Sequence, residues 1–157
     1  MNVRSIFRPW VVSVGGDDQL ADAAERMHNE QVGSVVVMVG GRFAGILTER
    51  DLIRAIAEGV DPRGATAAEY MTATPAAVHL DADIHEVAST MFEFECRHLP
   101  VLSEDDTQVI GMVSIQAPVA LKTAFSPFVP SPVISTDVRS TRASTICEAI
   151  VRFQINS

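Results

Sequence analysis

Aromatic residues are scarce in this chain: Phe, Trp and Tyr make up 6% of its 157 residues, while 47% of all residues are hydrophobic. A hydrophobic core must therefore consist mainly of aliphatic side chains. Cysteines are also few, and Cys96 and Cys147 give no disulfide framework. No window approaches the ~18 apolar residues of a membrane-spanning helix, and no signal-like apolar run follows the first residues. We therefore expect a cytoplasmic protein without a membrane partner.

Basic residues are outnumbered, with 12 Lys and Arg against 20 Asp and Glu and a net charge of −8. The imbalance lies in residues 1–121, which carry 18 acidic and 8 basic side chains, whereas residues 122–157 carry two acidic and four basic ones. A nucleic-acid binder needs clustered Lys and Arg to displace counterions from phosphates, and this chain has no such cluster. The charge distribution therefore argues against a nucleic-acid partner.

An internal repeat organises the first three quarters of the chain. A shift of 64 residues superimposes two sets of apolar positions at helical spacing, which are Leu20, Ala23, Ala24 and Met27, and Ile84, Val87, Ala88 and Met91. After a two-residue insertion, Gly45-Ile46-Leu47-Thr48 aligns with Gly111-Met112-Val113-Ser114 at a shift of 66. The predicted organisation is repeat one at residues 1–60, a linker at 61–66, repeat two at 67–121, and an extension at 122–157 with a short helix.

Each copy has the pattern of a β-α-β-β-α unit. In the first copy we expect strands at residues 11–14, 34–39 and 43–47, and helices from about residue 20 and at residues 49–58. Gly40-Gly41 suits the tight turn between two strands, because glycine readily adopts positive φ. One copy cannot bury both its sheet and its helices. The predicted fold is therefore α/β (α+β in some schemes), with two repeats stacked sheet to sheet about a pseudo-twofold axis.

The segment from Gly45 to Asp51 combines a strand end with a helix N-terminus, where free N–H groups favour anions. Thr48 offers a hydroxyl to a phosphate, and Asp51 offers a carboxylate that can accept hydrogen bonds from two ribose hydroxyls. Arg50 adds a mobile cation beside them. Thr48 and Asp51 also have the spacing of a capping box, and the motif taken alone favours this purely structural role.

The sequence Gly-Ile-Leu-Thr-Glu-Arg-Asp-Leu at residues 45–52, the hairpin before it and the second copy resemble the cystathionine-β-synthase (CBS) domain family. The resemblance covers about residues 1–120. Such a tandem pair is called a Bateman module, and it typically binds AMP, ADP, ATP or S-adenosylmethionine. The resemblance implies a non-catalytic regulatory module whose only cofactor-like molecule is an adenosine nucleotide.

In this family each site combines the Thr-x-x-Asp motif of one repeat with the first strand and a loop of the other. The resemblance implies a first site made of Ile46, Thr48, Arg50 and Asp51 from repeat one, and of Thr74, Pro75, Ala76, Cys96, Arg97 and His98 from repeat two. Residues 74–76 would line the adenine, and Arg97 or His98 would approach the phosphate.

A second site would combine Met112 and Ser114 with Trp10, Val11, Val12, Val32 and Gly33. Repeat two has Ala117 where repeat one has Asp51, and repeat one has Gly33 where repeat two has Arg97. The loss of a charged hydrogen-bonding partner costs about 1.5–3 kcal/mol, which is tenfold or more in affinity. We therefore predict a degenerate second site, either empty or filled by Trp10.

Other chemistries have weaker support. The four histidines have no metal-ligand spacing, so no metal is expected, and Cys96 with His98 has no evident third group for nucleophilic catalysis. The family forms flat homodimers, for which Leu52, Ile53 and Ile56 offer apolar surface. An unknown effector protein is a further possible partner. The alternative function is a dimerisation or interaction module that binds no ligand.

Overall fold

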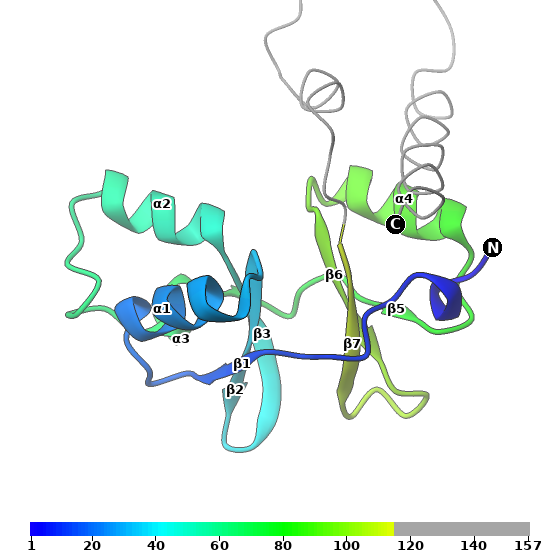
Figure 1. Ribbon diagram of the computed structural model, residues 1–157, viewed down its shortest axis with the longest axis horizontal. Coiled ribbons are helices and arrows are strands. Elements are labelled where there is room, and N and C mark those ends of the chain that lie inside the picture. The colour runs from blue at the N-terminus through cyan, green and yellow to red at the C-terminus, as the bar shows by residue number, and fades with distance from the viewer. Residues whose placement is uncertain (115–157) are drawn as a thin grey trace, which may run out of the picture.

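The computed structural model describes residues 1–114, which fold into two similar halves (Figure 1). The first half contains β1 (Ser13–Gly15), α1 (Leu20–Glu30), β2 (Ser34–Val39), β3 (Arg42–Thr48) and α2 (Glu49–Ala57). The second contains β5 (Val78–His79), α4 (Ile84–Glu93), β6 (His98–Leu102) and β7 (Val109–Ser114). A 3₁₀ turn, η1 (Val3–Ser5), leads into the first half, and the short helix α3 (Ala67–Tyr70) and β4 (Thr72–Ala73) lead into the second.

Two sheets occupy the centre of the molecule. One has the strand order β1-β2-β3-β4, and the other has the order β5-β6-β7. In each, the first strand is parallel to the second and the second is antiparallel to the third. Ser34 pairs with Thr48 in one sheet, and the equivalent His98 pairs with Ser114 in the other. The shared topology and register confirm the predicted α/β fold of two repeats.

Alternation along the strands gives each sheet two apolar faces. Val35 and Val37 of β2 pack into the core beneath α1, whereas the intervening Val36 points to the opposite face, where it too is buried. In β6, Leu99 and Val101 face the second core, and the buried Pro100 lies between them. In Figure 1, α1 and α2 lie at one side of the molecule and α4 at the other, with the sheets between them.

The segment that leads into each half packs on the other half. Val3 is fully buried in the core of the second half, while Ala67 is fully buried in the core of the first. β4 pairs with Gly45 and Ile46 of β3, and Arg8 forms the equivalent bridge to Met112 of β7. The two halves are therefore joined by an exchange of lead segments.

Two equivalent glycines permit this exchange. A Cβ atom on Gly45 would lie 2.5 Å from the carbonyl oxygen of Thr72, and one on Gly111 would lie 2.6 Å from that of Arg8. Both distances are too short for a real contact, and backbone atoms within a ladder cannot move aside easily. Glycine at these positions lets the lead segment of one half pass directly over the third strand of the other.

Most predicted elements occur within a residue or two of their expected ends. β1 begins at Ser13 instead of residue 11, because the ladder to β2 starts where Ser13 pairs with Val36. The second helix predicted for repeat two and the short helix of the extension lie outside the described residues. Within residues 1–114, no helix is long and apolar enough to cross a membrane.

We predict that Gly111→Ala lowers the free energy of unfolding by about 1–3 kcal/mol, because the added methyl group overpacks against the Arg8 backbone. Urea unfolding measures the change. The matched control is Gly64→Ala, since a Cβ there would meet nothing closer than 3.5 Å. Equal stability of the two variants would show that the lead segment does not pass close to β7.

Candidate functional site

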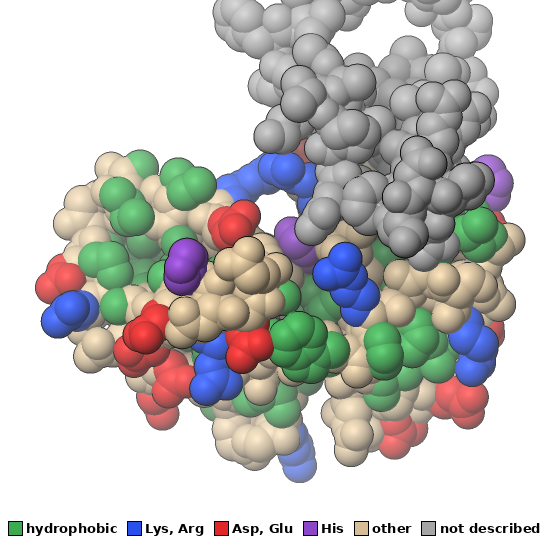
Figure 2. Space-filling model, in the orientation of Figure 1, with side chains coloured by type: hydrophobic (Ala, Val, Ile, Leu, Met, Phe, Trp, Pro, Cys, Tyr) green, Lys and Arg blue, Asp and Glu red, His purple; other side chains and the backbone are tan. Residues whose placement is uncertain are grey.

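A cavity of about 920 Å³ opens between the two halves and is lined by residues of both sheets. Figure 2 shows a hollow at this place, with basic, acidic and histidine side chains around it. Its apolar floor comes from the outward faces of the strands, which contribute Val36, Ile46 and Met112. The N-terminus of α2 forms part of one wall, and the segment before β6 forms part of the wall opposite.

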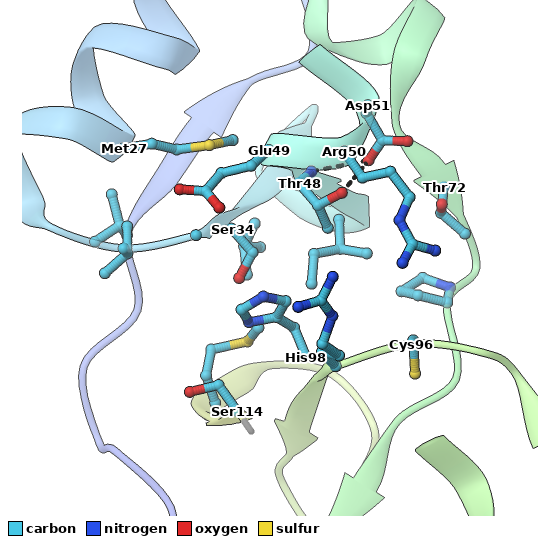
Figure 3. A pocket seen from close by; sticks show the side chains of 18 of the residues that line it. Met27, Ser34, Thr48, Glu49, Arg50, Asp51, Thr72, Cys96, His98 and Ser114 are labelled. Carbon is cyan, nitrogen blue, oxygen red and sulfur yellow. Dashed lines mark hydrogen bonds between the residues drawn. The ribbon is translucent and has the colours of Figure 1, made fainter. Parts of the chain in front are cut away.

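Asp51 lies at the α2 end of this cavity, where its side chain is 14% exposed. Its Oδ2 accepts hydrogen bonds from the backbone N–H of Thr48 at 2.9 Å and from the Thr48 hydroxyl at 2.8 Å (Figure 3). Its Oδ1 lies 3.5 Å from Nη2 of Arg54, which donates to the Tyr70 carbonyl at 3.0 Å. The capping box anticipated from the sequence therefore forms, and it forms within the cavity.

The lining also includes Thr74, Pro75 and Ala76, which follow β4 along the chain. Thr74 has φ = 49°, a conformation that is rare for a β-branched residue and typical of functional segments that their surroundings hold in place. In the first half, the N–H of Val36 donates to the carbonyl of Val12 at 2.9 Å. The equivalent donor in the second half is replaced by Pro100, which has no N–H. The Ala76 carbonyl, equivalent to that of Val12, therefore receives no bond from this position.

His98 lies in the middle of the cavity, across from Glu49 and Ser34 (Figure 3). A Cβ atom on Gly33 would lie 3.3 Å from the imidazole and 3.4 Å from the Glu49 carboxylate, so the glycine makes room for both groups. Burial lowers the pKa of His98 to about 4, and the charge of Arg97 adds to the effect. At neutral pH the cavity therefore contains an uncharged imidazole.

Cys96 is half-buried in the same cavity. Burial raises the pKa of its thiol, an effect that two backbone hydrogen bonds oppose. The raised pKa disfavours the thiolate, which is the nucleophilic form of cysteine.

All ten residues predicted for the first site line the cavity, namely Ile46, Thr48, Arg50, Asp51, Thr74, Pro75, Ala76, Cys96, Arg97 and His98. Of the residues predicted for the second site, Trp10, Val12, Val32, Gly33, Met112 and Ser114 line the same cavity, whereas Val11 does not. The two expected clefts are thus continuous. Trp10 lines the cavity and is 57% exposed. It therefore does not fill the predicted second site, which was one of the two outcomes expected for that site.

Sequence reasoning missed several lining residues, among them Arg8, Ser34, Glu49 and Thr72. The repeat alignment contained a signal for Ser34 but none for Arg8 and Thr72, since neither member of that pair was predicted. Ser34 is the counterpart of the predicted His98, and Arg8 is the counterpart of Thr72. Within residues 1–114, no group of three or more His, Cys, Asp or Glu side chains could hold a metal ion.

The CBS domain family matches residues 3–58 and again residues 67–117, which together make up more than half of the chain. This chain belongs to the CBS domain family. The double match coincides with the two halves of the fold, and the CBS motif Thr48-x-x-Asp51 lies at the cavity.

Curated relatives show the same family. Hypoxic response protein 1 of Mycobacterium tuberculosis is 34% identical over 113 residues, which cover 71% of this chain and 78% of that protein. The CBS domain-containing protein CBSCBSPB3 of Arabidopsis thaliana is 32% identical over 96 residues. The match covers 60% of this chain and only 17% of the plant protein.

Solved structures share the fold. The crystal structure of Hypoxic Response Protein I with two coordinated zinc ions has 30% sequence identity and a TM-score of 0.62, and the match covers 83% of this chain and all of that one. A CBS domain protein of Pyrobaculum aerophilum complexed with AMP has a TM-score of 0.68, with 80% of this chain and 98% of that chain covered. Its 20% identity shows a common fold alone.

We predict that His98 makes this protein less stable in acid. The unfolded chain, in which histidine has its ordinary pKa of about 6.5, binds the proton more tightly than the folded chain does. Above pH 6.5 His98 is neutral in both the folded and the unfolded chain, and the free energy of unfolding has its full value. As the pH falls to about 4, the free energy of unfolding decreases by on the order of 2–3 kcal/mol because of His98.

Urea unfolding between pH 4 and 7 measures this effect, and His98→Gln should flatten the pH profile. His28→Gln, which removes an exposed histidine of α1, is the control. An unchanged profile in His98→Gln would contradict the proposed cost of burying a charged imidazole.

Proposed function

We propose that this chain is a non-catalytic regulatory module that binds an adenosine nucleotide in the cavity between its two CBS repeats. The main support is the position of Asp51, which lies in the first turn of α2 inside a cavity that Thr74, Pro75 and Ala76 also line. The expected ligands are AMP, ADP, ATP and S-adenosylmethionine. Because CBS pairs of the same fold are known in complex with AMP, and with S-adenosylmethionine and 5-methylthioadenosine, the proposal has a structural precedent.

The Asp51 end of the cavity suits a ribose. A carboxylate has about four lone-pair sites, and the Thr48 donors use only part of this capacity on Oδ2. The remaining sites can accept hydrogen bonds from two adjacent hydroxyl groups. Arg54 lies 3.5 Å from Oδ1 and helps to fix the orientation of the carboxylate before a ligand arrives.

The part of the cavity lined by Pro75 and Ala76 suits a flat base with an amino group. Pro75 and Ala76 provide a small apolar surface, and Ala76 has a carbonyl that the proline at position 100 leaves without its usual strand partner. The amino group of adenine is a suitable donor for this carbonyl. The apolar floor at Ile46 would lie against the base.

A regulatory role is a better proposal than catalysis. The reactive candidate in the cavity is Cys96, and its raised pKa disfavours the thiolate. A ligand that contacts both halves favours the arrangement of the halves that it binds more tightly. The size of the shift is limited by the difference in its affinity for the two arrangements. The module would then act in the cytoplasm on its own assembly or on an effector protein.

The experiment compares the capping box of α2 with that of α3. Thr66 donates to Glu69 through its N–H at 2.7 Å and its hydroxyl at 3.1 Å, as Thr48 does to Asp51, but this second box lies outside the cavity. Asp51→Asn and Glu69→Gln both remove one negative charge with little change of shape. Only the first variant should affect nucleotide binding.

We expect Asp51→Asn to weaken binding of adenosine ligands at least about tenfold, since it loses charged acceptors for the ribose. For the wild type, a ligand at 100 times its dissociation constant adds about 2.7 kcal/mol of stability, which a thermal shift detects. Glu69→Gln should keep this shift. If Asp51→Asn also keeps it, or if no adenosine ligand stabilises the wild type, the nucleotide proposal is wrong.

We also propose that the module forms a homodimer through α2. Ile53 and Ile56 lie three residues apart on this helix and are 66% and 65% exposed. Apolar side chains of this size on an exposed helix face favour burial against a second surface. Should no nucleotide bind, a dimerisation or interaction module is the function that this surface supports.

The double variant Ile53→Lys, Ile56→Lys should convert the dimer to a monomer without unfolding it, because both side chains are exposed in the single chain. Light scattering coupled to size exclusion measures the mass, and circular dichroism reports the fold. Arg26→Lys with Glu25→Lys, on exposed positions of α1, controls for the added charge. A wild type that is already monomeric at high concentration would contradict the proposal.

A further inference from the structure

Three arginines from three separate segments line the cavity. Arg8 belongs to the lead segment before β1, Arg50 lies in the first turn of α2, and Arg97 precedes β6. Within residues 1–114, none of the three forms an ion pair with a carboxylate within 4.0 Å. Figure 3 shows the Arg50 side chain extending from α2 into the cavity. In the part of the chain that the structure describes, these guanidinium groups therefore have no ion-pair partner and can bind an anion.

The carboxylates that line the cavity are Glu49, Asp51 and Glu95. Asp51 already accepts two hydrogen bonds from Thr48 and lies 3.5 Å from Arg54, which is a fourth arginine outside the lining. Glu49 lies beside the neutral His98, next to Gly33. Among the described residues, the carboxylates thus leave Arg8, Arg50 and Arg97 without an ion-pair partner. A guanidinium matches the oxygen pair of a phosphate, and paired contacts of this kind are stronger than neutral hydrogen bonds.

The arginines are spread over both halves of the cavity. Arg8 forms a bridge to Met112 of β7, whereas its repeat counterpart Thr72 pairs with Ile46 beside the Asp51 motif. Arg8 therefore adds a cation at β7, whereas the aligned position Thr72 beside β3 is uncharged. Arg50 and Arg97 belong to the predicted first site, so the three arginines as a set extend from the Asp51 end of the cavity toward β7.

The size of the cavity supports an extended ligand. A volume of about 920 Å³ is near the upper end of the range of about 300–1,000 Å³ found for small-molecule pockets. The three arginines that line the cavity offer more guanidinium groups than one phosphate needs, so a chain of phosphates suits them better than a single phosphate does.

We propose that the cavity binds a nucleoside polyphosphate, such as ADP or ATP, in preference to AMP or the cationic S-adenosylmethionine. The nucleoside lies at the Asp51 end, and the phosphate chain extends toward Arg8. This inference rests on the proposed nucleotide-binding function, and it names the class of nucleotide for the same cavity. It also gives the second half of the cavity a role as a phosphate subsite in place of a lost nucleoside site.

Calorimetric titration with adenosine, AMP, ADP, ATP, S-adenosylmethionine and tripolyphosphate tests the inference. We expect ATP to bind at least about tenfold more tightly than AMP, since one charged contact contributes about this factor. Arg8→Ala should weaken ATP binding about tenfold and change AMP binding less than about twofold. Arg4→Ala is the matched control, because Arg4 is exposed four residues away and does not line the cavity.

The outcomes separate this inference from the function on which it rests. If AMP binds as tightly as ATP, or if Arg8→Ala weakens both equally, the module still binds nucleotides but the phosphate subsite is wrong. If tripolyphosphate binds in an Arg8-dependent manner while adenosine and AMP do not bind, the arginines select phosphate chains but the nucleotide proposal fails. If none of the six compounds binds, both are wrong.

Discussion

The exchange of lead segments between the two repeats is the constraint on which the rest of the structure depends. Each segment pairs with the third strand of the other repeat, where Gly45 or Gly111 lets the backbones approach closely. This exchange fixes the separation of the two sheets and so creates the cavity. It also brings Thr74, Pro75 and Ala76, which follow β4 directly, into the same cavity as the end of β3 and the start of α2.

The Thr48–Asp51 pair has a structural role in capping α2 and a separate role in the function that we propose. The pair caps α2 with the same hydrogen bonds that Thr66 and Glu69 form at α3. What distinguishes the two boxes is their surroundings, because only Asp51 lies in the cavity. The capping bonds and Arg54 hold the carboxylate in one orientation, so a ligand would lose little affinity to ordering it. The structural and functional readings of this motif are therefore compatible.

The repeat pattern predicted the fold and much of the site because both depend on local signals. The aligned positions Leu20 and Ile84 are buried in equivalent cores, and the strand-to-helix motif positions Thr48 and Asp51 as its spacing indicated. The role of Gly33 could not be read in this way. Because Gly33 aligns with Arg97, it was interpreted as the loss of a cation. In the fold it makes room for His98 of the other repeat.

Features that depend on contacts distant in sequence were also not predicted. No local pattern indicates that Arg8 crosses to β7, because its partner Met112 is about a hundred residues away. The same crossing makes the two expected clefts continuous, which assigns Arg8 to the cavity and leaves Val11 outside its lining. The two repeats therefore differ in two respects: in their motifs, and in the residues that each contributes to the lining of the assembled cavity.

The stoichiometry of nucleotide binding tests the central claim most directly, namely that the exchanged repeats form one continuous cavity with one nucleoside end. Native mass spectrometry of the full chain at saturating ATP counts the bound ligands. One nucleotide per chain is the result that a single asymmetric cavity predicts. Two nucleotides bound with equal affinity, or none, would contradict it.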